Sequence, residues 1–158
     1  IIRHYFSFVG KASIKKVPLF GYLYSRLNIL VDRKDRASRT ATLSKSIRAL
    51  QSNRSIIIFP EGGIVSNNFP FMANPLKDGA FAMAIQQQVP VLPVSFLNNF
   101  QMMDDDYFAL KPGKIKVIIH APIETKGMTQ EDMPMLREKV FQTIQQPILD
   151  YHGVDLPQ

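Results

Sequence analysis

The sequence predicts an α/β fold in which a largely parallel or mixed sheet is flanked by helices. Short apolar runs rich in β-branched and aromatic residues alternate along the chain with segments whose apolar residues recur at helical spacing. Strands separated by helices are typical of βα units, which build parallel sheets covered on both faces. Apolar residues make up 46% of the 158 residues, enough for one domain with a core. We therefore expect residues 1–158 to form a single domain, or part of one.

The expected elements follow from these runs in chain order. Strands are predicted at five apolar runs: Tyr5–Val9, Asn28–Val31, Ser55–Phe59, Val89–Phe96 and Lys114–Ala121. Of these, the third and the fourth are expected to be buried. Helices are predicted at Pro18–Leu27, Ser38–Gln51, Lys77–Gln87 and from Thr129 onward. Pro18 suits a first helical turn.

Each later helix carries an apolar stripe that should face the core. The last helix begins at a capping pattern, in which Thr129 is followed by Asp132 three residues on and by Pro134 in the first turn. The stripes, in chain order, are Leu43, Ile47 and Leu50; Phe81, Ala84 and Ile85; and Met133, Leu136, Val140, Phe141 and Ile144.

The charge is placed unevenly. Residues 1–54 hold twelve Lys and Arg against two Asp, a net of +10, whereas residues 55–158 hold seven against eleven Asp and Glu, a net of −4. A basic half indicates an anionic partner such as a phosphate ligand or an anionic membrane surface, although a solvated basic face would look the same. Aromatic residues are not interleaved with the basic ones, and no nucleic-acid-reading motif occurs, so we expect no nucleic-acid partner.

Several other classes are excluded or disfavoured. The absence of Cys excludes disulfides and Cys-based zinc or nucleophile chemistry. The longest apolar run, Val89–Leu97, is far shorter than the ~20 residues that span a bilayer. The histidines His4, His120 and His152 lack metal-ligand spacing, and we interpret His120 as structural. Asp104–Asp106 lacks the Gly and Glu of a calcium loop, so we interpret it as a solvated turn.

Three places at strand or helix ends could bind anions or hydroxyls. Arg33 follows a strand, where its guanidinium could hold a phosphate; alternatively it is a surface charge. Glu61, followed by Gly62 and Gly63, could present a carboxylate above the sheet edge, or the segment could be a plain turn. Lys77–Gly79 opens a helix, whose free N–H groups suit an anion, although ordinary capping would also place polar residues there.

Each of these motifs is a weak signal alone, but the order in which they follow one another along the chain is specific. The blocks are Phe8-Val9-Gly10-Lys11-Ala12-Ser13, Lys16-Val17-Pro18-Leu19-Phe20-Gly21, Ile29-Leu30-Val31-Asp32-Arg33, Phe59-Pro60-Glu61-Gly62-Gly63, Lys77-Asp78-Gly79-Ala80-Phe81 and Val89-Pro90-Val91-Leu92-Pro93-Val94. Together they resemble the lysophosphatidate (1-acylglycerol-3-phosphate) acyltransferase family, from just after its first motif to its C-terminus. The resemblance covers essentially the whole chain.

The resemblance implies an enzyme of phospholipid biosynthesis. Such an enzyme transfers an acyl chain from a thioester co-substrate, acyl-CoA or acyl carrier protein, to the hydroxyl of lysophosphatidate, giving phosphatidate. It needs no metal or other cofactor. The family's base is a His in a His-x-x-x-x-Asp motif upstream of the first block. His4 is followed after four residues by Val9 rather than Asp, so we do not assign it that role. Because the chain opens without Met inside an apolar stretch, we interpret it as the C-terminal portion of the domain and expect it to be inactive alone.

The resemblance also implies residue roles. Arg33 corresponds to the phosphate-binding arginine, while Glu61, Gly62 and Gly63 correspond to the acceptor site and Lys77 and Gly79 to an anion site beside it. The supporting positions are Lys11, Pro60, Pro90 and Pro93. The family often reads Glu-Gly-Thr-Arg-Ser at the fourth block, and here Ile64 stands where the basic residue would be. Another lysolipid acceptor is therefore an alternative, as is a pseudoenzyme that binds lipid or an anionic membrane without catalysis. We expect association with a membrane surface, at its cytoplasmic face.

Overall fold

The computed structural model describes residues 5–63, 69–104 and 109–155. His4, Ile64, Asp105 and Asp106 therefore lie outside the described residues. The chain divides into two compact units, which we call unit 1 (Ile1–Pro60) and unit 2 (Glu61–Gln158).

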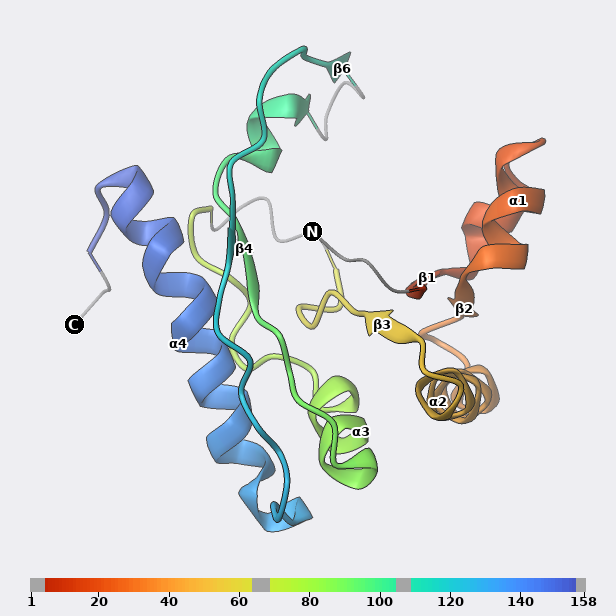
Figure 1. The fold of residues 1–158 in the computed structure, drawn as a ribbon. Helices are drawn as coiled ribbons and strands as arrows, with labels where there is room; N and C mark the ends of the chain where they lie inside the picture. The colour runs from red at the N-terminus through yellow and green to blue at the C-terminus, as the bar shows by residue number, and fades with distance from the viewer. Residues whose placement is uncertain (1–4, 64–68, 105–108, 156–158) are drawn as a thin grey trace. The chain divides into compact units, whose positions relative to one another are not determined.

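Unit 1 is built around a three-stranded parallel sheet. Its central strand is β1 (Phe6–Lys11), with β2 (Ile29–Val31) on one side and β3 (Ser55–Ile57) on the other (Figure 1). Val9 lies opposite Ile29, and Ser7 lies opposite Ile56. The parallel pairing confirms the prediction of βα units, because each return to the sheet passes through a helix.

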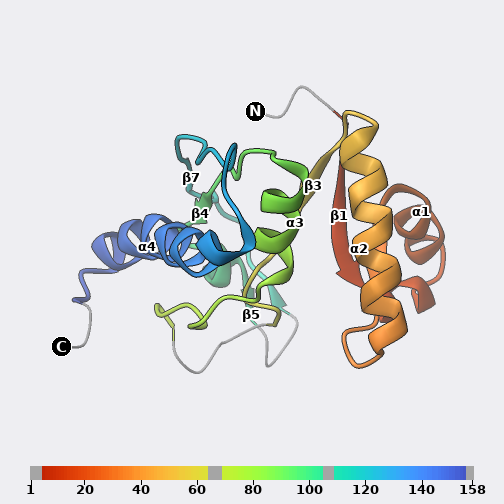
Figure 2. The same cartoon turned by 90° about the horizontal axis from the view of Figure 1, so that it is seen from below.

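Two helices connect these strands. After a 3-10 turn at Ala12–Lys16, α1 (Phe20–Leu27) leads into β2, and α2 (Arg36–Gln51) leads into β3 and packs against the sheet (Figure 2). The Asp35 carboxylate caps α2 by accepting hydrogen bonds from the N–H groups of Ala37 and Ser38, both at 3.0 Å.

The buried face of α2 differs from the predicted one. Its buried residues are Thr42 and Ser46, whereas Leu43 is exposed and the other two residues of the predicted stripe, Ile47 and Leu50, are partly buried. The Thr42 hydroxyl donates to the carbonyl of Leu30 at 3.0 Å, and the Ser46 hydroxyl donates to the carbonyl of Thr42 at 2.9 Å. Short side chains that satisfy their own hydroxyls let the helix lie close to the sheet, so apolarity alone did not identify the inner face.

The described residues of unit 2 form two α-helices, two short 3-10 helices and two antiparallel strand pairs. The α-helices are α3 (Gly79–Gln87) and α4 (Met133–His152). Strand β4 (Val94–Phe96) pairs with β7 (Val117–Ile119), and β5 (Met103–Asp104) pairs with β6 (Ala109–Leu110). The whole is therefore a mixed α/β structure in which a parallel sheet and antiparallel pairs are accompanied by helices.

The core of unit 2 lies where α3 and α4 pack together and α4 packs against β4. Its buried cluster is Leu76, Phe81, Ile85, Leu97, Ile123, Leu136, Val140, Phe141, Ile144 and Ile148. The stripes predicted for these two helices are confirmed, with Met133 packed at the margin of the cluster. Before α4, the N–H of Thr129 donates to the Asp132 carboxylate at 2.7 Å, as the capping pattern indicates.

Two strands that were expected to be buried are only half covered. In β3 and the residues after it, Ser55 and Phe59 are exposed and the residues between are partly buried. Along residues 92–97, the buried side chains Pro93, Ser95 and Leu97 alternate with more exposed ones. This period of two is that of a strand with one face on the core, whereas the apolar run had indicated burial on both faces.

A buried amide on α4 fixes a segment without regular structure. Gln145 is almost fully buried, and its Oε1 accepts the N–H of Met72 at 2.6 Å. Its Nε2 donates to the carbonyl of Pro70 at 3.0 Å. One side chain thus satisfies two backbone groups that have no ladder or helix to satisfy them.

This arrangement predicts that Gln145→Leu is destabilising. The substitution keeps much of the volume but leaves the Met72 N–H and the Pro70 carbonyl without their partner, at a cost of about 1–3 kcal/mol in unfolding free energy. Chemical denaturation would measure it. Gln146→Leu is the matched control, because Gln146 is exposed and bonds only to Asp150 on its own helix; its effect should stay within about 0.5 kcal/mol. Equal effects of the two substitutions would contradict the interpretation.

Candidate functional site

The turn after β3 requires glycine at its centre. Gly62 has a φ of +79°, a left-handed conformation that side chains other than glycine rarely adopt. A Cβ built on Gly62 would also lie 3.1 Å from Cγ of Lys77. The next residue, Gly63, is exposed, and a Cβ there would meet no described residue within 4 Å. The turn therefore has one glycine for conformation and close packing and a second that leaves its backbone accessible.

Glu61 connects this turn to the segment before α3. Its partly buried carboxylate accepts the N–H of Ala73 through Oε2 at 3.1 Å. The neighbouring residues Pro70 and Met72 are held by Gln145, so the segment 70–73 is tied down by two side chains. A carboxylate offers about four acceptor positions. Among the described residues, the hydrogen bond from Ala73 occupies one of these positions, so capacity remains for a ligand hydroxyl.

The start of α3 differs in detail from the prediction. The helix begins at Gly79 rather than at Lys77, and Asp78 occupies the N-cap position. The Asp78 side chain does not cap the helix; it forms a salt bridge with Arg137 of α4. Lys77 and Gly79 are exposed, and a Cβ at Gly79 would meet nothing within 4 Å. Space is thus left at the helix N-terminus beside the Lys77 side chain.

The structure brings together two of the three places that the sequence singled out. The Lys77 stem lies against Gly62, and Glu61 is the residue directly before that glycine. A carboxylate with spare acceptor positions, an exposed ammonium and a helix N-terminus therefore occupy one region of unit 2. This set of groups suits a ligand with both a hydroxyl and an anionic group.

Arg33 lies in a hydrogen-bonded loop of unit 1. It follows β2 by two residues and is exposed. The loop is shaped by Asp32, whose carboxylate accepts the N–H of Lys34 at 3.0 Å, and by Arg39, whose Nη1 donates to the carbonyl of Arg33 at 3.1 Å. The backbone is fixed at the carboxyl end of a parallel strand, which is where ligands bind in α/β sheets.

The supporting positions have simpler roles. Lys11 ends β1, opposite Val31 of β2, with an exposed side chain. Pro60 is partly buried at the last position of unit 1. Pro90 is exposed, whereas Pro93 is buried and its carbonyl accepts the N–H of His120 at 3.1 Å. The block Val89–Val94 thus leads into the β4–β7 pair without contributing a reactive group.

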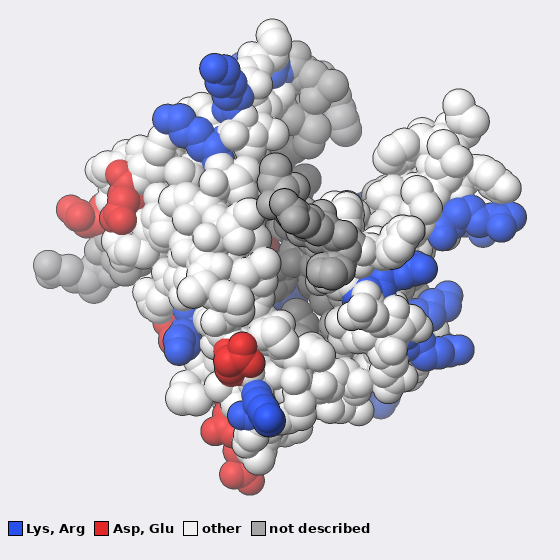
Figure 3. Space-filling model, viewed as in Figure 1, with Lys and Arg blue, Asp and Glu red and all other residues white. Residues whose placement is uncertain are grey.

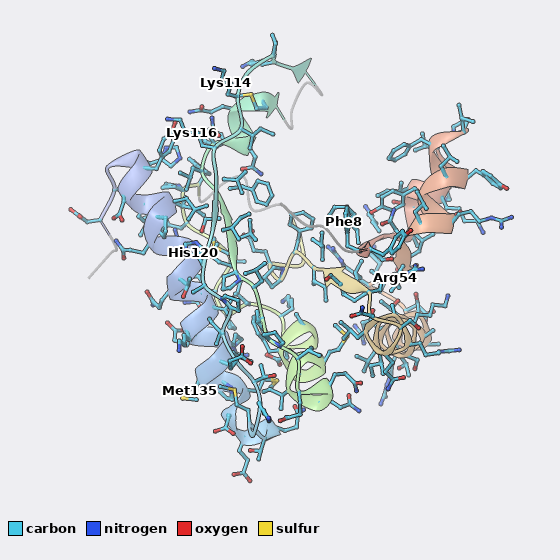
Figure 4. All side chains as sticks on the ribbon, viewed as in Figure 1. Phe8, Arg54, Lys114, Lys116, His120 and Met135 are labelled. Atoms are coloured by element: carbon cyan, nitrogen blue, oxygen red, sulfur yellow. The ribbon has the colours of Figure 1, made fainter. Side chains whose placement is uncertain are left out.

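The Ser–His pair of unit 2 is structural. His120, which follows β7, lies 2.8 Å through Nε2 from the hydroxyl of the fully buried Ser95 (Figure 4). Because that hydroxyl donates its proton to the carbonyl of Ile144 at 3.0 Å, its oxygen accepts from His120. The serine proton is therefore not available to the imidazole. This geometry supports the structural interpretation of His120 and leaves no activated nucleophile at this pair.

Sequence reasoning missed two contributors to the site. Gln145 lies next to Ile144 in the apolar stripe of α4, and a polar residue on a buried face was the available signal. The pairing of Asp78 with Arg137 joins residues 59 positions apart and has no local signal.

Comparisons with known proteins show the family of the chain. A family model described as acyltransferase matches residues 2–97, more than half of the chain. The 1-acyl-sn-glycerol-3-phosphate acyltransferase of Saccharomyces cerevisiae is 31% identical over 133 residues, which cover 83% of this chain and 44% of the yeast protein. The protein of that name from Haemophilus influenzae is 34% identical over 127 residues, 79% of this chain and 51% of that protein. The chain thus spans about half the length of these curated relatives.

A solved structure shares the fold. The crystal structure of PlsC, the 1-acyl-sn-glycerophosphate acyltransferase of Thermotoga maritima, matches with a TM-score of 0.72 at 23% sequence identity, over 96% of this chain and 58% of that one. The likeness confirms the predicted fold class. The match of the family model over more than half of the chain shows the family: the chain belongs to the acyltransferase family, and the two curated relatives above are named 1-acyl-sn-glycerol-3-phosphate acyltransferases.

Proposed function

We propose that this chain supplies the acceptor-binding part of a 1-acylglycerol-3-phosphate acyltransferase. The reaction transfers an acyl chain from a thioester, on coenzyme A or acyl carrier protein, to the hydroxyl of lysophosphatidate, and it releases phosphatidate and the free thiol. The observation that carries the proposal is the contact of the Lys77 stem with Gly62, directly beside Glu61. This contact places a hydrogen-bond acceptor, Glu61, and a cation, Lys77, in one region of unit 2. Lysophosphatidate carries a hydroxyl for the first and a phosphate for the second.

Each of these residues suits one chemical group of the acceptor. Glu61 accepts a hydrogen bond from the glycerol part, while its other oxygen remains bonded to Ala73 and holds its orientation. Lys77, also of unit 2, provides a mobile point charge for the phosphate. The resemblance separately implies that Arg33 of unit 1 binds phosphate, and its planar guanidinium can do so by two parallel hydrogen bonds. By holding the hydroxyl in place, these residues would lower the entropic part of the activation free energy for acyl transfer.

The proton of the attacking hydroxyl needs a base that none of these residues provides. The resemblance assigns it to a His-x-x-x-x-Asp motif, whose Asp would orient the imidazole. We therefore expect the 158-residue chain to bind lysophosphatidate but to catalyse no transfer. Lipid binding with transfer absent even in the complete enzyme would favour the pseudoenzyme alternative.

We also propose that the chain works at a membrane surface, since its acceptor is a lipid and residues 1–54 are strongly basic. None of the helices in the described part of the chain combines the length and the apolarity that crossing a membrane requires.

Substitutions of Glu61 separate its two roles. Glu61→Ala removes the partner of the Ala73 N–H, so we expect faster hydrogen exchange at that amide and loss of lysophosphatidate binding. Glu61→Gln keeps one carbonyl oxygen for Ala73, so the amide should stay protected, but the second acceptor oxygen is replaced by a donor. Binding should therefore weaken by about tenfold or more, as expected for a lost charge-assisted hydrogen bond. If Glu61→Gln binds like the unsubstituted chain, Glu61 acts only through the segment 70–73.

Substitutions of the cations test the phosphate contacts. We expect Arg33→Ala and Lys77→Met each to weaken lysophosphatidate binding about tenfold or more, because each removes a charged partner of the phosphate. Binding of monoacylglycerol, which lacks the phosphate, should not change. Lys34→Ala and Lys126→Met are the matched controls, because both lysines are exposed and belong to the same units. Equal losses for both lipids would show that the substitutions act through the structure rather than through the phosphate. Equal losses for the control variants would show a general charge effect, and either result would contradict the assigned phosphate contacts.

A further inference from the structure

Helix α1 presents an exposed apolar face. The residues of this face, from here on the α1 face, are Val17, Leu19, Phe20, Tyr22, Leu23 and Leu27, with exposed fractions between 48% for Val17 and 81% for Leu19. Phe20, Leu23 and Leu27 recur at helical spacing and therefore share one side of the helix. So many large apolar side chains on eight helical residues and the turn before them form a patch of the kind that marks an interaction site.

The opposite side of α1 packs against the rest of unit 1, so the α1 face points away from it. Gly21 is buried on the 3-10 turn, and a Cβ there would overlap the carbonyls of Ile14 and Lys15. The ring of Tyr24 occupies the space beside Gly10 of β1. These two contacts select which side of the helix is buried, and they leave Phe20 and the leucines of the α1 face more than half exposed.

Cations border the α1 face. A hollow of about 420 Å³ lies at the base of α1 and is lined by Lys15, Ser25, Arg26, Asn28, Ile29, Leu30 and Lys45, with no acidic residue among these described positions. The Arg26 guanidinium lies 5.3 Å from the centre of the Tyr22 ring, at the margin of the apolar face. Figure 3 shows Lys and Arg side chains over unit 1, whereas the Asp and Glu side chains on this view belong to unit 2.

We infer that the α1 face docks into the surface of an anionic bilayer and that the hollow beside it receives a lipid phosphate. Leucine and aromatic side chains bordered by Lys and Arg are the composition of interfacial helices. The inference rests on the membrane association proposed above and names the surface responsible. Charge complementarity selects this occupant. A second copy of the chain would bring like cations together across a symmetric interface, whereas anionic headgroups neutralise them.

Binding of the 158-residue chain to lipid vesicles tests the inference. We expect sedimentation with phosphatidylcholine vesicles that contain phosphatidylglycerol, and much weaker binding to phosphatidylcholine alone or at high salt. Leu19→Ser and Leu23→Ser should each lower the partition coefficient about tenfold, because the lost apolar area no longer enters the interface. Lys15→Ser and Lys45→Ser should each lower it about fivefold. The matched controls Met135→Ser and Lys139→Ser, at exposed positions of α4, should change nothing.

A fluorescence probe locates the contact. The chain has no Trp, so Leu23→Trp introduces a single indole on the α1 face and Met135→Trp introduces one at the exposed start of α4 (Figure 4). We expect anionic vesicles to shift the emission of the Leu23→Trp chain to the blue and brominated lipids to quench it, with neither effect at position 135.

The outcomes separate the possible occupants. Equal shifts at both positions, or no vesicle binding, would overturn the inference. A blue-shifted Leu23→Trp emission without vesicles that depends on protein concentration would overturn it in favour of a second copy. Binding of lysophosphatidate in detergent by the unsubstituted chain reports on the acceptor site independently, so a failure of the α1 face leaves the proposed function standing, and the reverse also holds. Circular dichroism of each variant verifies that its helices remain formed.

Discussion

The candidate site around Glu61 and Lys77 depends on how the irregular segment 70–73 is held in place. This segment has no strand partner or helix of its own, so its backbone groups rely on the side chains of Glu61 and Gln145. Gln145 ties it to the packed face of α4, and Glu61 ties it to the glycine turn. Lys77 and the start of α3 follow a few residues later, so their position depends on the same two anchors. A residue that looks like a ligand-binding carboxylate therefore also builds the site.

Small residues have the corresponding role in unit 1. Gly21 lets α1 lie on the preceding turn, Gly10 makes room for Tyr24, and Thr42 and Ser46 bring α2 close to the sheet. Close backbone packing at these places replaces the usual burial of large apolar residues. The leucines and aromatics of α1 are consequently available for a partner outside the unit.

The sequence predicted what is local or repeated, and it did not predict contacts between distant residues. The parallel order around β1 followed from apolar runs alternating with helical patterns, and the stripes of α3 and α4 followed from their spacing. Spacing did not reveal the antiparallel pairing of β4 with β7, since a short apolar run has no direction. Nor did it reveal the inner face of α2, which uses hydroxyls. Within the candidate site, only the order of the motifs along the chain indicated that Glu61 and Lys77 belong to one region. No feature of the sequence indicated the hydrogen bond from the Ala73 N–H to Glu61.

The dimensions of α1 determine how it can meet a membrane. Eight residues rise about 12 Å along a helix axis, less than half of the ~30 Å hydrocarbon core. The helix can therefore lie in the interface but cannot cross it, with its apolar side toward the acyl chains and Arg26 at headgroup level. Lysophosphatidate has its phosphate and its free hydroxyl in that same headgroup layer. A domain that rests on the surface through α1 would thus meet the proposed acceptor without extracting it fully from the membrane, and the cost of exposing the acyl chain of the lipid to water would be avoided.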